Sequence, residues 1–73
     1  MSDEKRYAVW CRPDQSVVSC TEKVKVMNEN LDEIVQAMQD AFEDGLLMEV
    51  AEDQMKAVLH RLVDNLHNPY QKR

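Results

Sequence analysis

Two kinds of side chain in this sequence could do chemistry: a cysteine thiol and a row of imidazole and carboxylate groups. Cys20 comes directly after Ser19, at a predicted helix start, where the helix dipole and free N–H groups stabilise a thiolate. Lys23 lies one turn further along. Such a thiol suits a redox sensor or an attachment point, and the alternative is a small apolar residue that fills a corner. Cys20 is therefore the candidate reactive thiol.

The second group is His60, Asp64 and His67, spaced i, i+4, i+7. On one helix they would line a single strip, and imidazole with carboxylate at that spacing binds transition metals. The same strip carries Lys56, which would repel a cation, and it lies well away from the apolar side of the helix. A hydrated polar surface is the simpler interpretation, so we assign no metal ligands and expect no cofactor.

No catalytic motif accompanies these residues. The chain lacks a phosphate-binding glycine loop, a Gly-x-Ser-x-Gly turn and a Cys/His pair close in sequence. A chain of 73 residues buries only about 60% of the surface that its unfolded form exposes, which leaves little room for a deep cleft. We predict that the protein is not an enzyme.

The composition indicates one small domain over residues 1–73. Hydrophobic residues make up 44% of the chain, which is enough to fold, and charged residues 32%. Two cysteines are too few for a disulfide scaffold, and residues 1–6 lack the apolar core of a signal peptide. No apolar run reaches the ~20 residues of a membrane span. We expect a cytoplasmic protein without a membrane partner and with flexible ends at 1–6 and 69–73.

Residues 7–20 predict a β-hairpin. Both arms are rich in β-branched and aromatic residues, and Pro13 and Asp14 suit the centre of a type I turn over 12–15. Cys11 would then lie opposite Val17 or Ser16, too far from Cys20 for a disulfide, so we expect two free thiols. Both faces of the ribbon carry apolar side chains, so something else must cover one of them.

Residues 20–46 predict one long amphipathic helix, with Ser19 and Glu22 as a capping box. At about 100° per residue its apolar side chains fall in one stripe and its acidic ones on the opposite side. The stripe consists of Val24, Met27, Leu31, Ile34, Val35, Met38, Ala41 and Phe42. The alternation over 23–26 also permits a third strand, with a second capping box at Asn30 and Glu33.

Residues 51–67 predict a second helix that Asn68-Pro69 ends, because Pro69 lacks an N–H and restricts the residue before it. Its apolar side consists of Met55, Val58, Leu59, Leu62, Val63 and Leu66. The short connection makes the two helices antiparallel neighbours. The predicted fold class is therefore α+β and mainly helical: a β-hairpin followed by an antiparallel two-helix hairpin.

Charge is strongly segregated along the chain. The net charge is −5, but residues 26–54 hold nine acidic groups and no Lys or Arg. This segment either keeps a small protein dissolved or docks a basic protein partner. Its candidate partner-binding residues are Glu29, Asp32, Glu33, Asp40, Glu43 and Asp44.

A strand followed by two helices resembles the layout of ribbon-helix-helix DNA-binding proteins. The resemblance covers the layout alone, since no motif residues match. It implies a DNA-binding regulator, and Arg6, Arg12, Lys23 and Lys25 would form its basic patch. The net negative charge and the acidic long helix argue against phosphate contacts, so we expect no nucleic acid partner.

The chain has more apolar surface than it can bury alone, so we predict a homodimer. Full burial of one large apolar side chain contributes about 1.5–3 kcal/mol, which makes several exposed ones costly. The function stays unknown at this level. The leading hypothesis is a non-catalytic acidic interaction module, the second a thiol- or metal-dependent sensor using Cys20 or the His60 strip, and the third a DNA-binding regulator.

Overall fold

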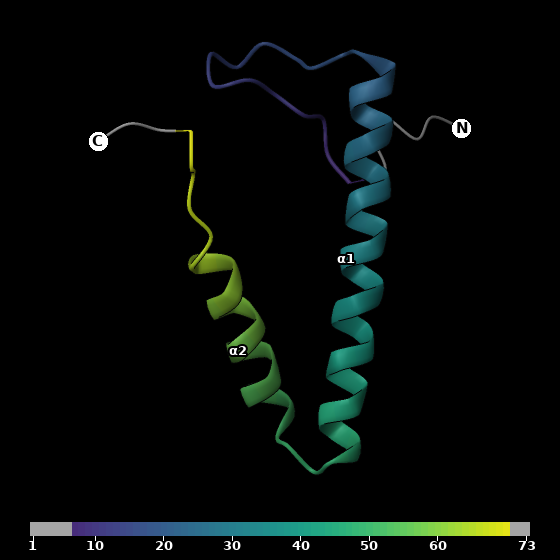
Figure 1. The fold of residues 1–73 in the computed structure, drawn as a ribbon, viewed down its shortest axis with the longest axis vertical. Helices are drawn as coiled ribbons and strands as arrows, with labels where there is room; N and C mark the ends of the chain where they lie inside the picture. Colours follow the sequence, from purple (N-terminus) through teal and green to yellow (C-terminus); the bar gives the residue numbers. More distant parts are fainter. Residues whose placement is uncertain (1–6, 71–73) are drawn as a thin grey trace. The chain divides into compact units, whose positions relative to one another are not determined.

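The computed structural model describes residues 7–70, and in this range the chain forms two helices (Figure 1). α1 spans Thr21–Leu47 and α2 spans Glu52–Asp64. The chain divides into two compact units, one ending at Gln36 and the other beginning at Ala37, and α1 contributes to both. Neither helix is long and apolar enough to cross a bilayer. Flexible ends were expected at 1–6 and 69–73, and of these residues 1–6 and 71–73 lie outside the described residues.

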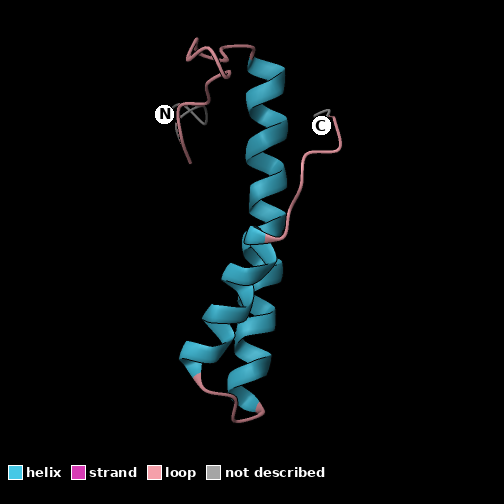
Figure 2. Cartoon of the chain, turned by 90° about the vertical axis from the view of Figure 1, so that its left-hand side faces the viewer, coloured by secondary structure: helices cyan, strands magenta, loops and turns pink. Residues whose placement is uncertain are grey.

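The predicted β-hairpin over 7–20 is wrong, and with it the α+β fold class. The described residues contain no strand, only one isolated antiparallel bridge between Cys11 and Val17 (Figure 2). Pairing stops there because the two arms have different destinations. The first arm runs back along α1, where Tyr7 Oη donates a hydrogen bond to Asp32 Oδ1 at 2.6 Å, while the second arm joins the beginning of α1. The described fold is therefore all-helical.

The turn within this segment lies where the sequence predicts it. The Gln15 N–H donates to the Arg12 carbonyl at 2.8 Å, and the Arg12 N–H donates to the Ser16 carbonyl at 2.8 Å. Gln15 has a φ of 73°, the left-handed conformation that commonly follows such a turn. Asp14 Oδ1 accepts from the Ser16 N–H at 2.9 Å and from the Ser16 hydroxyl at 2.6 Å. Side-chain and backbone bonds together fix the turn without a sheet.

α1 begins one residue later than predicted and includes residues 23–27, which excludes the third strand. The Val24 N–H donates to the Cys20 carbonyl at 3.0 Å, so Cys20 occupies the N-cap position rather than the first helical one. Val24 is 4% exposed and Asn28, one turn later, is 1% exposed. These two side chains form the buried centre of the first unit.

Backbone hydrogen bonds end α1. The Val50 N–H donates to the Gly45 carbonyl at 2.9 Å and the Glu49 N–H to the Leu46 carbonyl at 3.0 Å. Together they form the Schellman motif, in which the residue after the C-cap adopts a left-handed conformation. Glu49 fills that position with a φ of 68°, where glycine is the usual residue. The connection to α2 is therefore fixed by backbone geometry.

The second unit is a helical hairpin made by the end of α1 and by α2. Gly45 is buried against Met55, and a Cβ at position 45 would overlap the Met55 sulfur and lie 2.9 Å from its Cγ and Cε. Val58 and Leu59 are half-buried, whereas Leu62 and Val63 are exposed. Glycine at this position lets the two helix backbones approach closely.

α2 ends at Asp64, three residues before the predicted end at 67. Asn65 takes the C-cap position, and its N–H still reaches the carbonyls of Arg61 and Val63. Leu66 is 78% exposed, so no packing holds a further turn, and Asn favours caps over helix interiors. Residues 69 and 70 form a turn in which the Tyr70 N–H donates to Asn68 Oδ1 at 2.8 Å.

Candidate functional site

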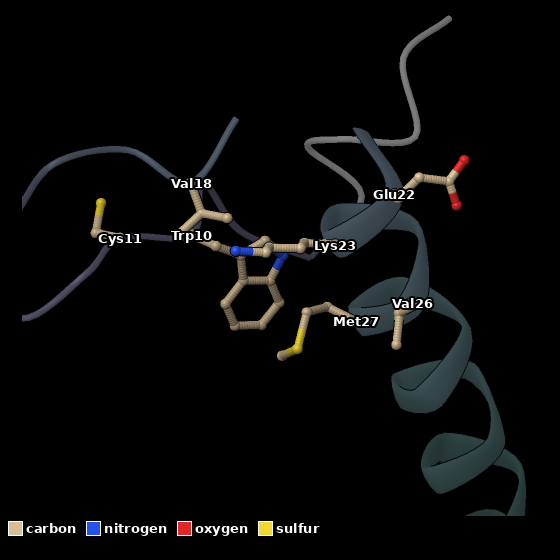
Figure 3. A pocket seen from close by; sticks show the side chains of 7 residues that line it. All are labelled: Trp10, Cys11, Val18, Glu22, Lys23, Val26 and Met27. Carbon is tan, nitrogen blue, oxygen red and sulfur yellow. The ribbon is translucent and has the colours of Figure 1, made fainter. Parts of the chain in front are cut away.

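The candidate site is an apolar pocket of about 530 Å³ beside the first turns of α1, here called the Trp10 pocket (Figure 3). It is open to solvent on one side. Its volume lies within the range of about 300–1,000 Å³ that is typical of ligand pockets. The lining residues come from the segment before α1 and from α1 itself: Trp10, Cys11, Val18, Glu22, Lys23, Val26 and Met27.

Trp10 is the centre of this pocket. Its indole ring lies between Val18 and Met27, and the Lys23 side chain extends from α1 toward it (Figure 3). The indole N–H is buried and no described residue accepts a hydrogen bond from it. In this structure the indole N–H is therefore not a donor into the pocket. The lining is mainly apolar, with Glu22 and Lys23 as its charged residues.

Both cysteines are free and exposed, as the sequence predicts. Cys11 lines the Trp10 pocket, and its bridge to Val17 is one of the two expected pairings. Cys20 lies at the N-cap of α1. Within residues 7–70 no group of three or more potential metal ligands includes either thiol.

The structure does not place the histidine strip on one helix. His60 and Asp64 belong to α2, but His67 lies beyond its end. Across the described part of the chain, no three His, Cys, Asp or Glu side chains come together as a metal site. Lys56 Nζ instead pairs with Glu52 Oε2 at 3.4 Å and lies 5.8 Å from the centre of the Phe42 ring.

All six predicted acidic partner-binding residues lie on α1 and are exposed. Asp32 accepts a hydrogen bond from the Tyr7 hydroxyl, and Glu43 Oε2 accepts one from the Gln39 amide at 2.8 Å. The other four fall within about 60° around the helix axis, on the side opposite the apolar stripe. We call this set the outer acidic strip: Glu29, Glu33, Asp40 and Asp44.

Sequence reasoning missed three features of the first unit: the Trp10 pocket, the buried Asn28 and the bond between Tyr7 and Asp32. Asn28 gives a signal that can be read, because it follows Val24 by one turn and therefore shares the phase of the apolar stripe. The pocket gives a weaker one, the shared phase of Trp10 and Val18 in the predicted ribbon. Tyr7 and Asp32 give none, since 25 residues separate them.

Comparison with known proteins does not identify the pocket or the acidic strip. No protein-family model, no curated protein and no solved structure matches this chain. Its function therefore has to be inferred from the surface that the chain itself presents.

Proposed function

We propose that this chain is a small non-catalytic interaction module of the cytoplasm, which forms a homodimer and presents its outer acidic strip to a basic protein. The observation that carries the proposal is the two-sided character of α1. Acidic side chains occupy one side of the helix and exposed apolar side chains the other. The two exposed thiols fit a reducing compartment.

The apolar side supports self-association. Ile34 and Val35, at the middle of α1, are 48% and 47% exposed, and on α2 Leu62 and Val63 are 58% and 59% exposed. Burying apolar surface contributes roughly 25 cal/mol per Å². A second copy carries the same surface, and a two-fold interface uses each patch twice. Pairing is therefore the simplest way to remove this surface from water.

The acidic side supports a charged partner. Within the outer acidic strip, Glu29 and Glu33 are four residues apart, as are Asp40 and Asp44, and such like-charged pairs destabilise a helix by about 0.2–0.5 kcal/mol each. No Lys or Arg between residues 26 and 54 offsets them. A basic partner would remove this repulsion, and its attraction to the strip would speed encounter.

Sedimentation velocity at micromolar concentration tests the homodimer. We expect a dimer of the 8.5 kDa chain, and we expect Val35→Glu to give a monomer because it places a charge in the apolar stripe. Ala37→Glu is the matched control, since residue 37 is exposed and lies off the stripe. A monomeric wild-type chain would contradict the proposal.

Capture from cell lysate tests the acidic strip. Reversing Glu33, Asp40 and Asp44 to Lys should abolish capture of a basic protein, and capture by the wild type should weaken as salt rises. The control reverses Glu49, Glu52 and Asp53, which changes the net charge equally and leaves the strip intact. Equal loss in both variants would show that only net charge matters.

A further inference from the structure

We infer that the basic partner binds the first unit through an aromatic side chain in the Trp10 pocket and through basic side chains that pair with Glu29 and Glu33, the first two residues of the outer acidic strip. All of these groups belong to the first unit. The inference rests on the proposed function and names the chemistry of the segment that the partner would present: one aromatic residue, with Lys or Arg two and four positions away.

The Trp10 pocket and the acidic strip adjoin each other on α1. Val26 lines the pocket, and Glu29 and Glu33 follow it by three and seven residues, so the three side chains fall within about 60° around the helix axis. Val26 is 51% exposed, and the two glutamates are exposed as well. One segment of a partner can therefore reach the pocket and both carboxylates along a single side of α1.

The apolar stripe does not account for this exposed surface. Val26 lies about 120° around the helix axis from the centre of the stripe that supports the homodimer. A second copy packed on Ile34 and Val35 would therefore not need to cover Val26. An exposed apolar surface bordered by charged side chains is typical of a protein interaction site.

The pocket favours an aromatic occupant. The Trp10 indole lies at its centre, and aromatic rings pack favourably against one another in offset or edge-to-face arrangements. The Lys23 side chain extends toward the indole, and an ammonium group is attracted to the face of an aromatic ring (Figure 3). The Met27 side chain ends beside the indole, and its sulfur also contacts aromatic rings favourably.

Charge places the basic side chains of the partner outside the pocket. Lys23 would repel a cation that entered it, and the Glu22 carboxylate points away from the indole (Figure 3). Further along α1, residues 26–36 hold three acidic groups and no Lys or Arg. Of these acidic groups, Glu29 and Glu33 belong to the outer acidic strip. A neutral aromatic residue in the pocket and cations beside the strip therefore satisfy both surfaces.

The spacing along α1 determines the spacing in the partner. Glu29 and Glu33 lie about 4.5 Å and about 10.5 Å beyond Val26 along the helix axis. In an extended peptide every second side chain points to the same face, and those two and four positions from the aromatic residue lie about 7 Å and about 13 Å from it. The flexible stems of Arg and Lys cover the remaining difference. The expected motif is therefore aromatic-x-basic-x-basic.

A synthetic peptide tests the inference: acetyl-Arg-Ser-Arg-Ser-Phe-Ser-Arg-Ser-Arg-amide, which carries the motif in both chain directions. Trp10 is the only tryptophan of the chain, so its fluorescence reports on the pocket. We expect the peptide to change the Trp10 emission and, by calorimetry, to bind more weakly as salt rises. Serine in place of the phenylalanine should raise the dissociation constant about tenfold to a hundredfold. Leucine there should raise it about threefold to tenfold.

Two double variants of the protein test the carboxylates. Glu29→Gln with Glu33→Gln should weaken binding of the phenylalanine peptide about threefold to tenfold, because two exposed ion pairs are lost. Glu49→Gln with Asp53→Asn removes the same charge outside α1 and should leave the dissociation constant within about twofold of the wild-type value. Equal weakening in both variants would overturn the assignment of Glu29 and Glu33.

The outcomes separate this inference from the proposed function. Equal affinity for the phenylalanine and serine peptides would overturn the inference and leave the acidic strip as a binding surface. Equal affinity for the phenylalanine and leucine peptides would overturn the aromatic preference. If the phenylalanine peptide does not bind, the inference is wrong, and capture of a basic protein from lysate still decides the proposed function.

Discussion

The two compact units of this chain are stabilised in different ways. The helical hairpin of the second unit depends on groups close in sequence: the bonds that end α1, the contact of Gly45 with Met55, and the short connection. The first unit depends on groups far apart, with Trp10 packed beside Met27 and Tyr7 bonded to Asp32. Local contacts form at low entropic cost, and distant ones must first close a loop. We therefore expect the contacts within the first unit to open at a lower free-energy cost than those within the second unit.

Removing the Trp10 ring should have the largest effect. Trp10→Ala deletes the main apolar side chain between residues 7–20 and α1, and we expect a loss of about 2–3 kcal/mol in the local stability of the first unit. Amide hydrogen exchange should then accelerate around Val24 and Asn28 and stay unchanged around Met55 and Leu59.

Trp10→Phe is the matched control for that experiment. It keeps an aromatic ring in the pocket and removes a buried N–H that has no acceptor among the described residues. We expect protection close to that of the wild type, because the lost contact area is offset by the removal of an unsatisfied donor. If Trp10→Ala accelerated amide hydrogen exchange equally in both units, the two units would not be stabilised independently.

Crowding the contact between the helices should have the next largest effect. Gly45→Leu places a side chain where even a Cβ overlaps Met55, and we expect a loss of about 1–3 kcal/mol in the free energy of unfolding. Urea denaturation followed by circular dichroism measures it. Ala37→Leu, at an exposed site on α1, should change stability by less than about 0.5 kcal/mol. A neutral Gly45→Leu would show that the hairpin opens freely.

The same contrast explains which elements the sequence could predict. The helices follow from local periodicity and from the Gly and Pro signals, so α1 is correct to within one residue at each end. The predicted second helix is three residues longer than α2, because Leu66 has the phase of the apolar side but is exposed. The apolar pattern alone therefore overestimates the length of this helix. The rival strand over 23–27 fails because the stripe over the whole of α1 outweighs alternation over four residues.

The hairpin and the pocket lie beyond such local reasoning. Residues 7–20 have strand-forming composition and a correctly predicted turn. Tyr7 nevertheless bonds to Asp32 of α1 and does not pair with the second arm of the predicted hairpin. β-propensity describes a fit to a half-buried surface, and here α1 provides that surface in place of a second strand. The Trp10 pocket forms because the segment packs against α1 and not against a second strand, so the pocket was not predicted. The acidic residues of α1 are exposed, as their position opposite the apolar stripe indicates, and their role in binding a partner stays a prediction.

A smaller, opposite effect should come from the end of α1. Glu49→Gly relieves a left-handed residue that carries a Cβ, and we expect a gain of about 0.5–1 kcal/mol after the greater entropy of glycine in the unfolded chain is deducted. Glu49→Ala removes the same charge and keeps the Cβ, so it should give no gain. If both variants stabilise equally, the benefit comes from lost repulsion among the acidic residues rather than from the backbone.

The smallest effect should be a pH dependence that distinguishes the turn over 12–15 from the Schellman motif at the end of α1. Two hydrogen bonds from Ser16 hold the pKa of the Asp14 carboxyl below its ordinary value, whereas the Schellman motif at Glu49 uses backbone groups alone. A carboxyl whose pKa is lower in the folded state stabilises it above the unfolded pKa, and this contribution disappears as pH falls through the folded pKa. NMR from about pH 6 to about pH 2 should therefore show the Ser16 amide shifting below the ordinary aspartate range near 3.9. Asp14→Asn accepts similar bonds without titrating, so its Ser16 amide should stay constant, and an Asp14 midpoint at or above the ordinary value would contradict the turn geometry.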